Sequence, residues 1–255
     1  MLVILLAAMA IKQYYSTASV NQLRWILAPT TLAVEFVTGS QFEFESYAGY
    51  VSSDRSFVIA ASCAGVNFLI TAFLLLALSK LWRARTQNEL AKLGWVFIPL
   101  SAVFAYLSTM VANTARIATA LGMHGKSLDV GGLSANQLHR LEGILIYFGF
   151  LLLLFVVNEQ IAQRRSTRFT QRRSLLRQSL FPLVIYYVTT LGVPLINSVR
   201  SGGLKTDFWE HSGFVLVAPL VLILLLSMLR FSRKFLIHTI LQRGDPSRPV
   251  NSETV

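Results

Sequence analysis

Apolar segments separated by short basic tracts make up almost the whole chain, and this pattern restricts the fold more than any other feature of the sequence. Seven such segments occur, at about 1–10, 23–37, 57–81, 93–120, 139–161, 180–196 and 214–229. A hydrocarbon core about 30 Å thick is crossed by about 20 apolar residues of helix, which satisfies its own backbone hydrogen bonds. The sequence therefore predicts an all-α fold, a polytopic transmembrane helix bundle of about seven spans.

The composition supports a membrane protein and argues against a protein that binds nucleic acid. Hydrophobic residues make up 54% of the 255 residues and charged residues 14%, with a mean hydropathy of +0.56. A soluble domain of this length usually cannot bury so much apolar surface. The net charge of +11 is concentrated in tracts between the apolar segments, as in cytoplasmic loops. We therefore expect the lipid bilayer as a partner and no nucleic acid.

The chain contains no internal repeat and no polar linker, so we expect one transmembrane domain over residues 1–240 and a polar, disordered tail over 241–255. Residues 41–56 combine acidic and aromatic side chains and are expected to lie along the membrane surface. The sequence has no CxxC, HExxH or glycine-rich phosphate motif, so we expect no metal and no cofactor.

The basic residues also predict the orientation of the spans. Lys12, Arg24 and the tracts within 80–92, 164–177 and 230–248 hold 17 of the 23 lysines and arginines. Seven alternating spans bring all of them to one face, which the positive-inside rule makes cytoplasmic. The N-terminus is then outside and the C-terminus inside.

Three residues that could carry chemistry fall near the opposite, outer face. Cys63, the single cysteine, is expected about two turns into the third span, Arg116 near the outer end of the fourth, and His139 at the outer start of the fifth. The orientation was derived from loop charge alone, so it supports a common site independently. A thiol, a guanidinium and an imidazole can act as nucleophile, oxyanion stabiliser and general base.

Each of these residues also has a structural interpretation. A lone cysteine in an apolar helix is usually a small hydrophobe, and a histidine at a helix start can simply lie at the interface. Arg116 can extend to the outer headgroups. However, an arginine inside a span costs about 2.5 to 3.5 kcal/mol at the bilayer centre, so such residues are commonly functional or paired.

Neighbouring residues are expected to support this site rather than to react. Asn113 shares a helix face with Arg116 at i and i+3, as Asn67 does with Cys63 at i and i+4, and we expect these amides to join helices. Gly65 would let another backbone approach the thiol. Glu142, one turn after His139, could orient the imidazole, although we expect a plain interfacial charge.

The order and spacing of three motifs resemble a known family. Cys63-Ala64-Gly65 enters one span, Asn113-Thr114-Ala115-Arg116-Ile117 closes the next, and His139 opens the one after. Over about residues 40–160 the chain resembles the exosortase/archaeosortase family of membrane cysteine transpeptidases, and it is most similar to the compact K-type exosortases. By that resemblance Cys63 matches the nucleophile, Arg116 the conserved arginine and His139 the catalytic histidine.

The resemblance implies a substrate, a reaction and a location. Its substrates would be membrane-tethered proteins that end in a short motif of the Pro-Glu-Pro type, a transmembrane helix and a basic tail. They would be cleaved through a thioester, which water or an amine then resolves. The location would be the inner (plasma) membrane of a bacterial cell, with the site facing the periplasm or the exterior.

Two other classes of function remain open from the sequence. In a small seven-span transporter or receptor, Arg116 would bind an anion and Cys63 would be packing. That class usually shows an intramembrane carboxylate relay or a broken helix near the midplane, and Glu35 is the only acidic residue well inside a predicted span. In an assembly subunit without catalysis, all three residues would be structural.

Overall fold

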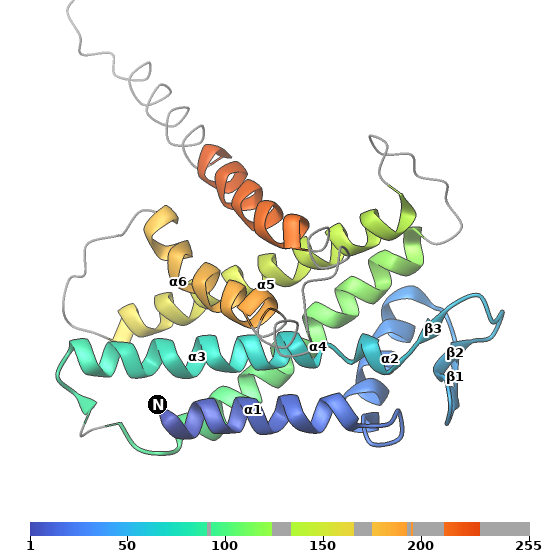
Figure 1. Ribbon diagram of the computed structural model, residues 1–255, viewed down its shortest axis with the longest axis horizontal. Helices are drawn as coiled ribbons and strands as arrows, with labels where there is room; N and C mark the ends of the chain where they lie inside the picture. Colours follow the sequence, from blue (N-terminus) through green and yellow to red (C-terminus); the bar gives the residue numbers. More distant parts are fainter. Residues whose placement is uncertain (91–92, 124–133, 166–174, 193–194, 196–211, 230–255) are drawn as a thin grey trace, which may run out of the picture.

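A computed structural model describes residues 1–90, 93–123, 134–165, 175–192, 195 and 212–229, and these residues are mostly helical (Figure 1). The helices are α1 (Leu2–Thr17), α2 (Arg24–Thr38), α3 (Val66–Thr86), α4 (Phe97–Met123), α5 (Ala135–Arg165), α6 (Leu175–Tyr187) with a π-helical turn η3 (Val188–Gly192), and a final helix (Ser212–Leu229). The tail at 241–255 lies outside the described residues.

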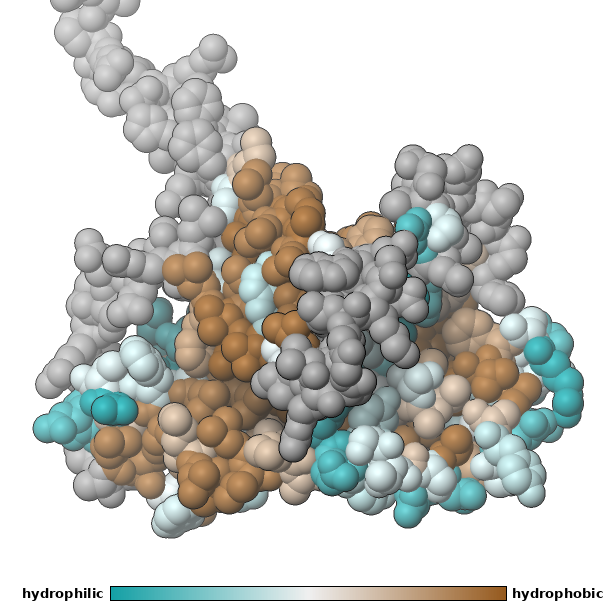
Figure 2. Space-filling view, in the orientation of Figure 1, coloured by the Kyte–Doolittle hydropathy of each residue, from teal (hydrophilic) through white to brown (hydrophobic). Residues whose placement is uncertain are grey.

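Four helical segments of the described chain are long and apolar enough to cross a membrane. They are Ala61–Thr86, Phe97–Met123, Gln137–Arg164 and Ser212–Leu229. Many of their outward-facing side chains are large and apolar, and Figure 2 shows an apolar region between hydrophilic residues at either end of the molecule. A helical membrane protein, as the sequence predicts, explains this exposed apolar surface.

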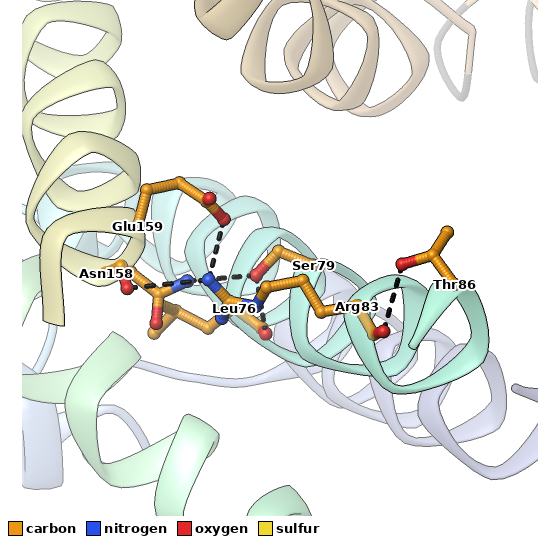
Figure 3. A network of polar contacts seen from close by, with 6 residues as sticks. All are labelled: Leu76, Ser79, Arg83, Thr86, Asn158 and Glu159. Carbon is orange, nitrogen blue, oxygen red and sulfur yellow. Dashed lines mark hydrogen bonds and ion pairs between the residues drawn. The ribbon is translucent and has the colours of Figure 1, made fainter. Parts of the chain in front are cut away.

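Helix α4 runs antiparallel to both α3 and α5, which gives the bundle two distinct ends. At one end, called here the Cys63 end, Asn113 of α4 contacts the segment that precedes α3. At the other, the Arg83 end, Arg83 of α3 forms a 2.6 Å ion pair with Glu159 of α5 (Figure 3). Helix α6 runs antiparallel to α5. Phe148 of α5 packs on Tyr186, whereas Phe155, further along α5, packs on the earlier residue Phe181 of α6.

The direction of α1 differs from the sequence-based prediction. Near the end of α1, Lys12 Nζ donates a 2.7 Å hydrogen bond to Asn67 Oδ1, and Tyr15 donates one of 3.4 Å to the carbonyl of Ala61. Lys12 therefore lies at the Cys63 end, and Figure 1 shows the N-terminus alongside the far part of α3. The prediction that put Lys12 and Cys63 at opposite faces is wrong, because the ammonium is bound by an amide of the bundle.

Helix α2, of 15 residues, does not run from one end of the bundle to the other. Both of its ends meet the same small sheet. The Arg24 guanidinium lies 4.5 Å from the ring centroid of Phe44, and Glu35 Oε1 accepts a 2.8 Å hydrogen bond from the backbone of Phe42. The prediction of seven spans counted this segment, whose ends stay on one side of the bundle.

An antiparallel sheet with the order β1-β2-β3 follows α2, where the sequence predicted only a surface segment. Its strands are β1 (Phe42–Glu45), β2 (Gly49–Ser52) and β3 (Val58–Ile59). The alternating Phe-Glu-Phe-Glu of β1 has the period of two that strands require. At Gly49, where φ is +121°, a Cβ would lie 2.3 Å from the carbonyl oxygen of Ile59. Only glycine therefore allows β2 and β3 to approach here.

The turn between β2 and β3 is held by a carboxylate. Asp54 accepts hydrogen bonds from the hydroxyls of Ser52 at 2.6 Å and Ser56 at 2.7 Å. These bonds lower the pKa of Asp54 to about 2, since they stabilise its charged form. The turn delivers β3 directly to the segment that contains Cys63.

The third predicted span begins later than expected. Residues 58–59 pair with β2, a 3₁₀ turn η1 (Ala61–Ala64) follows, and Gly65 adopts φ +70° before α3 starts at Val66. Cys63 therefore precedes the helix instead of lying two turns inside it. The strand pairing and the left-handed glycine decide this boundary, and hydropathy reports neither of them.

Candidate active site

Cys63 lies in the η1 turn, between the sheet and α3. Its backbone N–H donates a 2.9 Å hydrogen bond to the carbonyl of Ala60, and its own carbonyl accepts one of 2.6 Å from Asn113 Nδ2. Cys63 is a free cysteine and is partly exposed, while the next residue, Ala64, is buried. The backbone of the nucleophile candidate is thus held by two hydrogen bonds, although the residue is not buried.

Gly65 is required here for two reasons. Its φ of +70° is unfavourable for any residue with a side chain, and a Cβ would lie 3.0 Å from Cγ of Asn113. Asn113 itself is fully buried. The sequence predicted that Gly65 lets a backbone come close, whereas the approaching group is this amide side chain.

A hydrogen-bonded network joins Asn113 to Arg116 through α5. The Tyr147 hydroxyl donates to Asn113 Oδ1 at 2.7 Å and accepts from Arg116 Nη1 at 3.3 Å. The guanidinium carbon also lies 5.4 Å from the centroid of the Tyr147 ring, which stacks on Phe68 of α3. This network connects the turn before α3 with α4 and α5. It runs from the Cys63 carbonyl through Asn113 and Tyr147 to Arg116.

Arg116 packs directly against α5. A Cβ at Gly143 would lie 3.1 Å from Arg116 Nε, so glycine allows the side chain to lie against the helix backbone. His139, Gly143 and Tyr147 are four residues apart and share a helix face. Arg116 thus lies along this face of α5, against Gly143 and Tyr147.

His139 occupies the same end of the bundle but is more exposed. Its Nδ1 lies 3.3 Å from Glu142 Oε2, and its side chain is 48% exposed. Within the described residues, no hydrogen bond directly joins any two of Cys63, Arg116 and His139. The structure connects the first two through Asn113 and Tyr147, and His139 is bound to Glu142, whose neighbour Gly143 lies against Arg116.

The prediction that Glu142 is a plain interfacial charge is wrong. Its side chain is only 9% exposed, and one carboxylate oxygen is bound to His139. The other oxygen, Oε1, is buried and has no hydrogen-bond partner among the described residues. The spacing of three residues from His139 was a signal for this contact, but nothing in the sequence indicated the burial.

Two tyrosines were also missed. Tyr147 follows His139 by eight residues, two helical turns, so helical spacing alone could have placed it on the same face. Tyr15 comes from α1 and donates a 3.4 Å hydrogen bond to the carbonyl of Ala61, two residues before Cys63. No local pattern connects residue 15 with residue 63, so only the folded chain could show this neighbour.

The described part of the chain holds no group of three or more histidine, cysteine or acidic side chains arranged for a metal ion. Comparison of the chain with known protein families, with curated proteins and with solved structures found no match.

Proposed function

We propose that this protein is a membrane-embedded cysteine peptidase or transpeptidase that cleaves C-terminal sorting signals of exported proteins. The observation that supports the proposal is the network from the Cys63 carbonyl through Asn113 and Tyr147 to Arg116. It holds a partly exposed cysteine and a guanidinium at one end of an apolar bundle. Electrostatic stabilisation requires such preorganised donors near the nucleophile.

Each residue has a role in the proposed reaction. The Cys63 sulfur attacks the scissile carbonyl while His139 accepts the thiol proton, which it then returns to the leaving amine. A thioester remains, and water or an amine resolves it. Arg116 uses one N–H group for Tyr147 and keeps others for the developing oxyanion, a contribution of about 2.7 to 4 kcal/mol in comparable sites.

The Cys63 end is proposed to face the exterior. When Lys12 and Arg24 are assigned to that end, 15 of the 23 basic residues still fall in the tracts 80–92, 164–177 and 230–248, which follow α3, α5 and the final helix in the sequence. The positive-inside rule makes the Arg83 end cytoplasmic. In this revised topology α1 starts inside, α2 stays on the outer side, and six helices alternate across the membrane.

The proposed substrate is a membrane-tethered protein with a short motif, a transmembrane helix and a basic tail at its C-terminus. The basic tail would stay at the cytoplasmic face for the same electrostatic reason as the chain's own tracts. Its helix would then bring the motif to the Cys63 end. The apolar outer surface of the bundle is compatible with docking of such a helix in the bilayer.

The proposal is tested with a tailed protein and the variants Cys63→Ala and Cys63→Ser in membranes. Mass spectrometry of the substrate's C-terminus should show cleavage by the wild type and none by either variant. Ser62→Ala, at the exposed neighbouring residue, is the matched control and should cleave normally. Full cleavage by Cys63→Ala would remove the catalytic role and leave an anion-binding role for Arg116.

A further inference from the structure

Glu142 is buried where a carboxylate is costly. Only 9% of its side chain is exposed, and Oε1 has no hydrogen-bond partner within the described residues. A buried charge needs opposite charge or hydrogen bonds to offset its desolvation. His139 is one such group, because its Nδ1 lies 3.3 Å from Oε2, and the Arg116 guanidinium packs against the next residue of α5, Gly143.

The contact with His139 has a chemical consequence. A carboxylate only accepts hydrogen bonds, so in this pair Nδ1 of a neutral imidazole must carry the proton. Its lone pair is then on Nε2. The nitrogen that can accept a proton is therefore the one that does not face Glu142.

Glu142 is expected to contribute little to the stability of the fold. A pair three residues apart on one helix contributes little to stability, and a buried carboxylate with one unbonded oxygen is worse packing than an apolar side chain. Arg116 packs against the helix backbone at Gly143, the residue after Glu142. The Glu142 carboxylate therefore belongs to the same turn of α5 that the guanidinium contacts. The burial, the pairing and this location point to the site chemistry.

We propose that Glu142 is a positioning residue that holds His139 with its proton on Nδ1 and leaves Nε2 as the base for the Cys63 thiol. This inference rests on the proposed function for the identity of the reaction. Glu142 itself touches neither the thiol nor the substrate in this role. It acts through the imidazole, whose orientation would otherwise vary on a half-exposed side chain.

The first test needs no substrate. Full-length protein with ¹⁵N-labelled histidine is placed in lipid bilayers, and solid-state NMR at a pH where imidazole is neutral reports which nitrogen carries the proton. The chain has four histidines, so the His139 signals are assigned as those missing from His139→Gln. We expect the proton on Nδ1 in the wild type and a shift toward Nε2 in Glu142→Leu. A wild-type proton on Nε2 overturns the proposal.

The second test measures cleavage. Glu142→Leu should lower kcat about 100-fold, the lower end of what general-base catalysis contributes, with KM nearly unchanged. Glu142→Gln keeps an acceptor for Nδ1–H and should recover part of kcat. Arg140→Leu, which removes an exposed charge from the same turn, should keep wild-type kcat. A wild-type kcat in Glu142→Leu overturns the inference, whereas a wild type that cleaves nothing overturns only the proposed function.

Discussion

The Asn113 side chain donates a 2.6 Å hydrogen bond from Nδ2 to the backbone carbonyl of Cys63, fifty residues earlier in the chain. Its other end, Oδ1, accepts a hydrogen bond from Tyr147. Because both ends of this buried amide are used, its orientation is determined. Asn113 therefore fixes the turn before α3 relative to α4 and α5, and the predictions below start from this contact.

Replacing Asn113 by leucine should destabilise the protein and loosen the Cys63 turn. The Cys63 carbonyl and the Tyr147 hydroxyl would each lose a partner, at about 1 to 3 kcal/mol for a buried group. Thermal unfolding in detergent measures the loss, and alkylation of the single thiol should become faster. Ser101→Ala is the control, since that buried hydroxyl bonds only to its own helix. Equal effects of the two substitutions would contradict the structural role of Asn113.

Tyr147→Phe should separate positioning of Arg116 from packing. The ring can stay stacked on Phe68, but Arg116 and Asn113 each lose a hydrogen bond. We expect kcat for cleavage to fall at least about tenfold, as when transition-state contacts are misaligned. Tyr106→Phe removes a comparable 2.8 Å bond to the carbonyl of Trp25, away from the site. It should lower stability similarly and leave kcat unchanged, and an equal loss of kcat in both would sink this prediction.

Gly65→Ala should be more destabilising than Gly39→Ala. Both glycines have a left-handed conformation, φ +70° and +73°, which costs another residue about 1 to 2 kcal/mol. A Cβ at Gly39 meets nothing within 4 Å, whereas at Gly65 it meets Asn113 at 3.0 Å. Overpacking should add about 1 to 3 kcal/mol at Gly65 only. Equal shifts in unfolding temperature would mean that the amide moves aside freely.

The ion pair at the Arg83 end should contribute to stability through its burial. Arg83 and Glu159 are 21% and 23% exposed, and Asn158 donates a hydrogen bond to Ser79 beside them (Figure 3). Arg83→Leu leaves a partly buried carboxylate unpaired, and we expect a loss of about 1 to 3 kcal/mol, below the range for fully buried pairs. The double variant Arg83→Leu/Glu159→Leu should regain part of that loss.

The exposed pair Arg55–Glu45 in the sheet is the control for this prediction, because surface pairs contribute about 0 to 1 kcal/mol. Arg55→Leu should therefore change the unfolding temperature less than Arg83→Leu. If Arg83→Leu/Glu159→Leu is no more stable than Arg83→Leu, the unpaired Glu159 carboxylate is not the cause of the lost stability.

Labelling from the two sides of the membrane tests the revised topology. A membrane-impermeant maleimide should label Cys63 only from the outside, because the Cys63 end is proposed to be extracytoplasmic. Thr86→Cys in a Cys63→Ala background, at the other end of α3, should be labelled only from the inside. A tag before Met1 should be accessible only from the inside, since α1 ends beside α3's start. Outside access to that tag would restore the original orientation of α1.

For the candidate site, residue type and the topology predicted from loop charge selected Cys63, Arg116 and His139 as candidates, because few side chains of this chain can carry such chemistry. The residues that contact them could not be predicted from residue type or spacing alone. Whether Glu142 is exposed or buried depends on how α4 lies against α5, and the spacing in the sequence is identical in both cases. The contacts of Tyr147 with Asn113 and Arg116 likewise depend on the rotation of α5 about its axis.

By itself, the sequence determined that the chain is helical and apolar enough for a membrane, and it placed both ends of α4 and α5 to within about four residues. Hydropathy and helix length are local properties, and lipid requires a helix to satisfy its own hydrogen bonds. Only the tertiary structure decided the direction of α1, the sheet before Cys63 and the start of α3 at Val66. Those features depend on contacts between residues far apart in the chain, such as Lys12 with Asn67 and Gly49 with Ile59, which no local pattern encodes.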